Sequence, residues 1–180
     1  LNDSRLEQLY LRSLLLLKLL QDRKFGSLIA APTLSPDYRY CWPRDAVYLA
    51  WALDRCGYHA EAHHFYRWCK RTQMHDGLWY QNHYTDGRRH WAGIQVDQVA
   101  AIIWGAWEHF KLTQDRAFLV EMWPTIRRAA NYLIARTDPN VKLVYSEQDL
   151  WEETGGFLTY TNAAAVAGFE AAARVAREVG

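Results

Sequence analysis

The chain has 180 residues, enough for one full-sized hydrophobic core, and half of them are hydrophobic. This composition, with 14% aromatic residues, excludes an intrinsically disordered chain. The 21 basic residues nearly cancel the 20 acidic ones, which argues against nucleic acid as the main partner, because phosphate binding needs a concentrated basic surface. Nine tryptophans are an unusual number and fit either a carbohydrate cleft or a large helical core.

The cysteines and the apolar runs bear on the cellular compartment of the protein and on its relation to membranes. Three cysteines are present, an odd number without the spacing of a metal site or a disulfide framework: Cys41, Cys56 and Cys69. They fit the free thiols of a reducing compartment, so we expect a cytoplasmic protein with no metal and no cofactor. The leucine run at residues 14–17 is too short to cross a bilayer, so no membrane partner is expected. The first residue is Leu1 rather than methionine, so residue 1 need not be the natural N-terminus.

Apolar residues recur at helical spacing in several segments, and no run alternates over six residues as a strand does. We expect helices at about 4–22, from Pro43 to a stop at Gly57, at 59–74, 95–111, 124–137 and 161–178. A short helical turn at 115–122 should lead into Pro124, which begins the fifth helix. Residues 25–43 should form a long, buried, non-helical loop of the kind that is often functional. The pattern predicts an all-α array of antiparallel helix pairs with its long loops at one end.

The long loops contain the unusual residues. The first ends in residues 38–45, YRYCWPRD. Arg44 and Asp45 form either a surface ion pair or a charged clamp for two sugar hydroxyls, with Asp45 accepting and Arg44 donating. The second loop ends in residues 90–97, HWAGIQVD, where Trp91 fits either a core aromatic or a platform for a sugar ring.

The third loop carries the acidic stretch 149–157, DLWEETGGF. It places three carboxylates and an indole within five residues, followed by two glycines. An acid that protonates a glycosidic oxygen needs a raised pKa, which apolar walls and nearby negative charge provide. The alternative is an acidic helix N-terminus, where carboxylates suit the helix dipole. Three loops with tryptophan and charge at one end favour a carbohydrate site.

Together the three stretches resemble the glucoamylases and their relatives in glycoside hydrolase family 15. Residues 36–45, 91–97 and 149–153 are similar to the three active-site segments of that family, in the same order and at similar spacing. The resemblance implies an (α/α)6 barrel whose active site is built from loops at one end. It also implies hydrolysis of α-glucosidic bonds from the non-reducing end, with inversion.

Residue by residue, the resemblance assigns roles to ten positions. Glu152 matches the general acid, and Arg44 and Asp45 match the pair that holds the terminal glucose. The other matched positions are cleft residues: Tyr38 at the oxocarbenium-like centre, the aromatics Trp42 and Trp91, Gln95 near the acid, Trp151 on the acid's apolar side, and Asp149 and Glu153, which tune the acid and contact substrate.

The second carboxylate that inversion requires is expected outside this chain. A general base must stand about 6.5–9.5 Å from the acid to leave room for a water. In this family it lies far downstream, and a twelve-helix barrel does not fit into 180 residues. We therefore expect residues 1–180 to be one partial catalytic domain, the N-terminal half of a barrel. It should pack against the missing C-terminal half, and the 180-residue chain alone should be inactive.

Three interpretations remain open. The first is a glucoamylase-type enzyme acting on α-glucosides, with the linkage undecided among α-1,4, α-1,6 and trehalose. The second is a non-catalytic carbohydrate-binding or regulatory domain of the same fold. It would be indicated by loss of the acid or of the Arg–Asp pair, and both are present. The third is a purely structural helical-hairpin protein, in which Trp91 and Trp151 would be buried.

Overall fold

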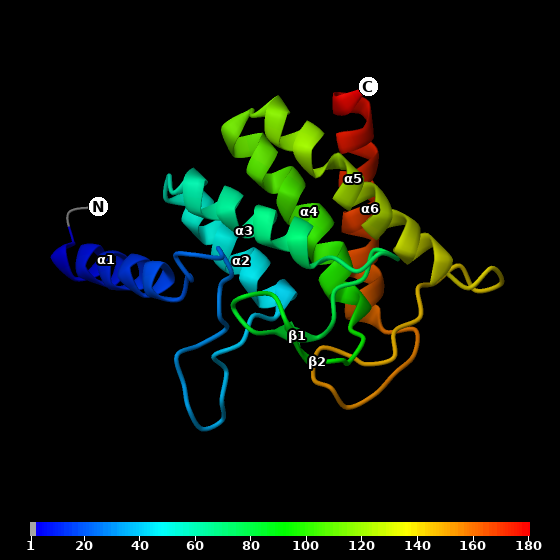
Figure 1. Cartoon of the computed structure of the whole chain (residues 1–180), viewed down its shortest axis with the longest axis horizontal. Coiled ribbons are helices and arrows are strands. Elements are labelled where there is room, and N and C mark those ends of the chain that lie inside the picture. The colour runs from blue at the N-terminus through cyan, green and yellow to red at the C-terminus, as the bar shows by residue number, and fades with distance from the viewer. Residues whose placement is uncertain (1–2) are drawn as a thin grey trace.

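The computed structural model describes residues 3–180, which contain six helices and one two-stranded sheet (Figure 1). The elements in chain order are α1 (Ser4–Leu19), α2 (Pro43–Arg55), α3 (His59–Thr72), β1 (Asn82–His83), β2 (Arg89–Trp91), α4 (Val96–Thr113), α5 (Arg116–Ala135) and α6 (Thr159–Val179). The all-α class is confirmed, and each expected helix is present. Residues 1 and 2 of the expected domain lie outside the described range.

Helix α5 differs from the prediction, because Pro124 lies inside it rather than at its start. A proline in a helix interior removes one backbone hydrogen bond and costs roughly 3 kcal/mol. The helix continues because one apolar stripe runs through both halves and is buried: Phe118, Leu119, Met122, Ile126, Ala129 and Leu133. Asp115 caps the helix, since its Oδ1 accepts from the N–H of Phe118 at 3.1 Å. The expected start of the fifth helix at Pro124 was wrong, because the helix begins at Arg116.

The short hairpin of β1 and β2 was not expected either. Its strands have two and three residues, which is too short for an alternating pattern to be visible in the sequence. The pairing is antiparallel, with Asn82 opposite Trp91. Cys41 extends it, because Cys41 and His83 exchange backbone hydrogen bonds of 2.9 and 3.0 Å. The hairpin therefore ties the first long loop to the second.

The helices form two layers. One layer consists of α2, α4 and α6, with α4 in the middle and packed on both neighbours. Helices α3 and α5 make up the second layer and pack on the first. Gly168 allows α6 to approach α4 closely, because a Cβ at this position would lie 3.1 Å from the Cα of Ala100. In the same way Gly105 admits the side chain of Val47 from α2. Small residues thus set the spacing of the α2–α4–α6 layer.

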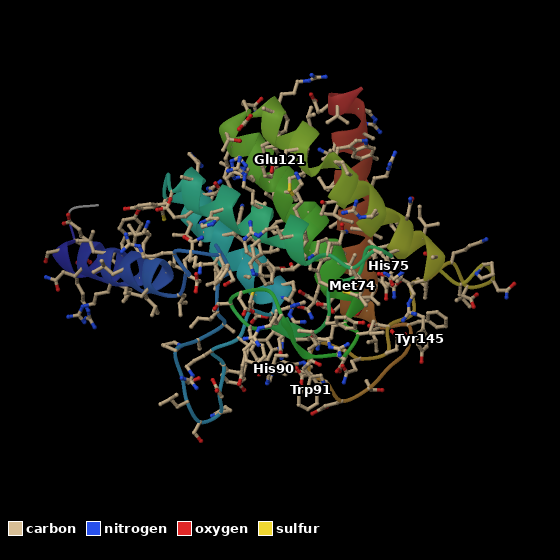
Figure 2. All side chains as sticks on the ribbon, viewed as in Figure 1. Met74, His75, His90, Trp91, Glu121 and Tyr145 are labelled. Carbon is tan, nitrogen blue, oxygen red and sulfur yellow. The ribbon has the colours of Figure 1, made fainter. Side chains whose placement is uncertain are left out.

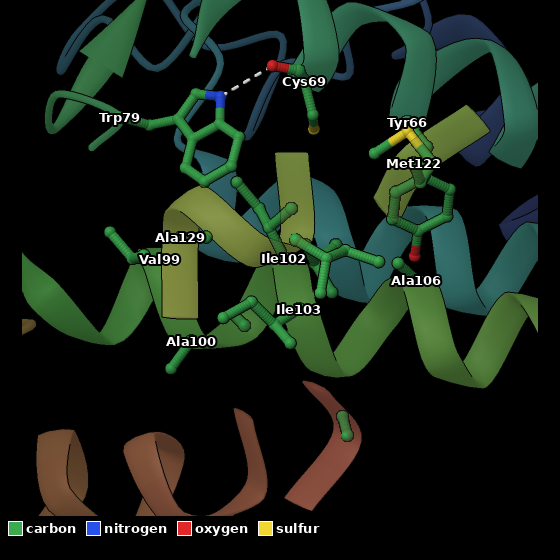
Figure 3. Packing of buried hydrophobic residues seen from close by; sticks show 14 of the residues in the cluster. Tyr66, Cys69, Trp79, Val99, Ala100, Ile102, Ile103, Ala106, Met122 and Ala129 are labelled. Carbon is green, nitrogen blue, oxygen red and sulfur yellow. Dashed lines mark hydrogen bonds between the residues drawn. The ribbon is translucent and has the colours of Figure 1, made fainter. Parts of the chain in front are cut away.

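Large side chains fill the space between the layers. Figure 3 shows Tyr66, Trp79, Ile102, Ile103 and Met122 packed together, all without exposed surface. The Nε1 of Trp79 donates to the carbonyl oxygen of Cys69 at 2.9 Å, so the polar atom of this buried indole is satisfied. Trp79 belongs to the loop after α3. Because its side chain is buried in the core, the first part of that loop is anchored there.

Helix α1 stands apart from the two layers (Figure 1). None of its residues is buried, and α2 is the helix it contacts most. Leu9, Leu15 and Leu19 are 61%, 64% and 80% exposed. This helix therefore presents an extended apolar surface to solvent.

The three long connections, residues 20–42, 73–95 and 136–158, gather at one end of the helices (Figure 1). The loop expected to be buried at 25–43 is buried only in part: Leu28 and Cys41 are enclosed, whereas residues 32–36 are exposed. None of the helices described for residues 3–180 combines the length and the apolar character needed to span a bilayer.

Candidate active site

A cleft of about 540 Å³ opens where the first and third long loops meet the start of α2. Six of its lining side chains come from the sites expected from sequence, and Leu150 and two alanines complete the wall. The full lining is Ala30, Ala31, Tyr38, Trp42, Arg44, Asp45, Leu150, Trp151 and Glu152. A larger hollow of about 640 Å³ lies between α1 and α3, but its carboxylate, Glu61, is already paired with Lys18.

The start of α2 positions the charged pair of the cleft. Pro43 occupies the first helical turn, where its missing N–H costs nothing, and Asp45 in the same turn suits the positive end of the helix dipole. Trp42 precedes the helix and is 9% exposed, with its ring 5.9 Å from that of Tyr38 in an edge-on contact. The two aromatic rings therefore form a continuous wall beside Arg44.

Arg44 is held mainly by residues other than its neighbour Asp45. Its Nη1 donates to Oδ2 of Asp97 at 3.0 Å and to Oε1 of Gln95 at 3.2 Å. The shortest approach to Asp45 is 3.5 Å, from Nη2 to Oδ2. Only 13% of the Arg44 side chain is exposed, so the ion pair expected between Arg44 and Asp45 is present but is not a surface pair.

Burial also acts on the two aspartates. Removal from water raises the pKa of Asp97, and the charge of Arg44 opposes that rise. Burial likewise raises the pKa of Asp45, again against Arg44. One guanidinium thus lies beside two carboxylates, of which Asp97 is fully buried and Asp45 is partly exposed.

Gln95 connects this pair to the loop that carries the acid. Its Oε1 accepts from Arg44 and from Nε2 of Gln98, and its own Nε2 donates to the carbonyl oxygen of Asp149 at 2.8 Å. The same carbonyl oxygen accepts from the N–H of Glu152 at 3.1 Å. A continuous series of hydrogen bonds therefore leads from Arg44 to the backbone of Glu152.

The acidic stretch forms a tight turn before α6. The N–H of Asp149 donates to Thr154 at 2.7 Å, and Oδ1 of Asp149 accepts from the N–H of Glu153 at 2.9 Å. Glu152 has a φ of 68°, a left-handed conformation that is uncommon for residues other than glycine. Since α6 begins only at Thr159, the alternative of an acidic helix N-terminus was wrong.

Exposure differs from one predicted site residue to the next. Glu152 and Glu153 are exposed, and Trp151 is 73% exposed, so the described residues do not enclose the acid in apolar surroundings. Trp91 is 56% exposed, which excludes a core role for it. It lies on β2 among the long loops, and Figure 2 shows it at the opposite end of the molecule from Glu121. Four predicted residues do not line the cleft: Trp91, Gln95, Asp149 and Glu153.

Sequence reasoning did not single out Asp97 and Gln98, the partners that fix Arg44. Asp97 is in the first turn of α4, where an aspartate is ordinarily explained by the helix dipole. Gln98 accepts from the N–H of Arg44 at 3.2 Å and is fully buried. The available signal was the run of polar residues at 95, 97 and 98, which opens an otherwise apolar helix.

The site joins carboxylates, a guanidinium and indoles in a cleft at the loop end of a two-layer helical domain, an arrangement suited to a glycosidase. Residues 5–77 and 69–180 match the glycosyl hydrolases family 15. The chain therefore belongs to that family.

Individual relatives agree with this assignment. The chain is 40% identical to an uncharacterized glycosyl hydrolase of Methanocaldococcus jannaschii, over 93% of this chain and 26% of the relative. It is 31% identical to an MMP endo-(1,4)-3-O-methyl-alpha-D-mannosidase of Mycolicibacterium hassiacum, over 62% of this chain and 31% of the relative.

A solved structure of a bacterial glucoamylase complexed with acarbose superposes with a TM-score of 0.77. It is 26% identical, over 94% of this chain and 25% of the glucoamylase. The fold is accordingly about half of the helices of an (α/α)6 barrel, as the sequence predicted. The chain spans about a quarter to a third of the length of the curated relatives it matches.

Proposed function

We propose that this chain supplies the general acid and the hydroxyl-binding residues of an inverting, exo-acting α-glucoside hydrolase. One observation supports the proposal most strongly. Glu152 lines the same cleft as Arg44 and Asp45, although the acid and the pair come from distant parts of the sequence. Family membership adds the reaction class, since relatives in this family are glycosidases.

In the proposed reaction Glu152 protonates the oxygen of the leaving group. The turn that carries it is anchored through Asp149 to Gln95, so the carboxylate is presented from a fixed backbone. A positioned acid of this kind contributes typically about 10²–10⁴-fold to the rate. Glu153 and Asp149 stand in the same turn as the acid.

Arg44 and Asp45 are proposed to bind hydroxyls of the terminal sugar. A carboxylate accepts from one hydroxyl and a guanidinium donates to its neighbour, which suits the adjacent hydroxyls of a pyranose. Asp45 retains an exposed side-chain fraction of 42% in the cleft, so it can meet a ligand. A site that binds the terminal sugar in this way cleaves the substrate from the end of the glycan chain, which is the basis for the proposed exo-action.

Aromatic side chains supply the apolar part of the proposed site. Tyr38 and Trp42 line the cleft on the side of the charged pair, and Trp151 lines it on the side of the acid. Sugar rings present an apolar face that stacks on such rings. Trp91 is exposed nearby in the loop end and is proposed as a further stacking platform.

The general base of the proposal comes from outside residues 1–180. The resemblance to family 15 implies this, and the chain spans only part of its relatives. Two consequences follow. The isolated 180-residue chain should release no glucose, and the full-length protein should release glucose first as the β-anomer.

The decisive experiment measures glucose release by the full-length protein from maltooligosaccharides, isomaltose and trehalose, with ¹H NMR to identify the first anomer. An α-mannoside belongs in the panel because one relative is named a mannosidase. Glu152→Gln should lower kcat by about 10²–10⁴-fold. Glu170→Gln, an exposed carboxylate on α6, is the matched control and should leave kcat unchanged.

Three outcomes would count against the proposal. Equal activity of Glu152→Gln and the unmodified protein would remove Glu152 as the acid. First release of α-glucose would exclude inversion. Binding of acarbose without turnover of any substrate would favour the alternative, a non-catalytic carbohydrate-binding domain.

A further inference from the structure

Asp97 is an unusually placed carboxylate. It stands in the first turn of α4, where aspartates are normally solvated, yet none of its side chain is exposed. Burying a charge is costly unless it is paired and hydrogen-bonded. Its partner is Arg44, and a single contact of 3.0 Å joins Nη1 to Oδ2. The other oxygen of Asp97, Oδ1, is buried and accepts no hydrogen bond.

Two carboxylates, Asp45 and Asp97, lie close to the guanidinium of Arg44, and Asp97 is the nearer of the two. The 3.0 Å contact with Asp97 is a charge-assisted hydrogen bond, whereas the 3.5 Å approach to Asp45 is longer than such bonds usually are. Oδ2 of Asp45, the oxygen nearest to Arg44, is buried and accepts no hydrogen bond. Nη1 of Arg44 also donates to Oε1 of Gln95 at 3.2 Å, and this second hydrogen bond fixes the orientation of the guanidinium.

Without Asp97, the nearest negative charge for Arg44 would be Asp45. A closed pair between these neighbours would occupy both of the groups that the cleft offers to a sugar. It would also draw the guanidinium away from Gln95 and from the hydrogen bonds that lead to Glu152.

We propose that Asp97 is a positioning residue: its hydrogen bond to Nη1 of Arg44 holds the guanidinium away from a close pair with Asp45, so that the exposed part of the Asp45 carboxylate can accept from a sugar hydroxyl. The inference rests on the proposed function for its effect on substrate, but the placement of Arg44 can be measured without substrate. Burial raises the pKa of Tyr160, at the start of α6, and the charge of Asp97 adds a smaller contribution, so Asp97 also lies near the start of that helix.

The test compares Asp97→Asn with the unmodified full-length protein. Loss of a hydrogen bond to a charged group costs about 1.5–3 kcal/mol, so we expect KM to rise about 10- to 150-fold, with a much smaller change in kcat. The Nη signals of Arg44 in ¹⁵N NMR should show restricted rotation in the unmodified protein and averaging in Asp97→Asn. Asp97→Glu, which keeps the charge, should retain the restricted signals.

Asp54→Asn is the matched control. Asp54 is a second buried aspartate, at the far end of α2, where it accepts from His59 and His109. This variant should lose stability without a change in KM or in the Arg44 signals.

The outcomes separate the two proposals. If the unmodified protein hydrolyses no α-glucoside, the proposed function fails, and the Arg44 signals alone decide the role of Asp97. Freely rotating Arg44 in the unmodified protein would overturn that role, and this measurement holds even if Asp97→Asn does not fold. An unchanged KM and unchanged signals in Asp97→Asn would also overturn it.

Discussion

The side chain of Gln95 donates to the carbonyl oxygen of Asp149 at 2.8 Å and so links the head of α4 to the loop of the acid. Through its Oε1 the same amide accepts from Arg44, which stands on α2. Gln95 is fully buried, so each of these bonds is made away from water. One amide group therefore sets the position of the charged pair relative to the acid.

We expect Gln95→Leu to disturb both sides of the cleft at once. The variant removes the acceptor for Arg44 and the donor for Asp149, and leaves buried polar groups without partners. An unsatisfied buried group costs about 1–3 kcal/mol, so kcat/KM of the full-length protein should fall about 10-fold or more. Unfolding in urea should show a loss of stability of similar size.

The control for this variant is Gln8→Leu on exposed helix α1, which should change neither quantity. A Gln95→Leu protein with the kinetic constants of the unmodified one would mean that the amide does not position the acid loop.

The helices could be predicted because their apolar spacing is a local property. The second helix, for example, has its two ends marked in the sequence by Pro43 and Gly57. The helix start expected at Pro124 was wrong because burial against α4 and α6 outweighs the local cost of proline. That burial depends on residues far apart in the sequence. The hairpin of β1 and β2 escaped prediction because its strands are too short to show a period.

The candidate site could be predicted in part, for a similar reason. The segments that carry charge and tryptophan are visible in the sequence, and the cleft joins residues from the first and third of them. The pairing of Arg44 with Asp97 was not visible, since the two residues are far apart in the chain and the nearer Asp45 is the obvious partner. Which charge compensates another depends on tertiary packing.

Two tryptophans of the same loop should behave in opposite ways. Trp79 has no exposed surface and donates to Cys69, whereas Trp91 is 56% exposed. We expect Trp79→Ala to lower the free energy of unfolding by about 3–5 kcal/mol, as large-to-small changes in a core do. Trp91→Ala should change it by less than about 0.5 kcal/mol, as exposed substitutions do, while weakening acarbose binding.

Urea unfolding measures the stability of both variants, and calorimetric titration with acarbose measures ligand binding by Trp91→Ala. A stable Trp79→Ala protein would contradict the packing between the layers. Unaltered binding by Trp91→Ala would remove that residue from the proposed site.

Acidification should destabilise the protein through His83. The imidazole is 1% exposed, and burial lowers its pKa, although Nδ1 donates to the carbonyl oxygen of Gly87 at 3.1 Å. Burial also lowers the pKa of His63. The unfolded chain protonates these histidines near their ordinary pKa of about 6.5, while the folded protein still resists the proton. Their contribution to stability is therefore present above that pH and is lost as pH falls through the lowered pKa values.

We expect the free energy of unfolding to decrease as the pH falls below about 6.5, the ordinary pKa of the histidines in the unfolded chain. His83→Gln should reduce this slope, because glutamine keeps a donor for Gly87 but does not titrate. The double variant with His63→Gln should reduce it further. Urea unfolding at a series of pH values measures the slope, and identical slopes for the unmodified protein and both variants would show that other groups cause the acid sensitivity. The carboxylates Glu61 and Glu121, whose pKa values are lowered by their cationic partners, act only at lower pH and do not contribute in this range.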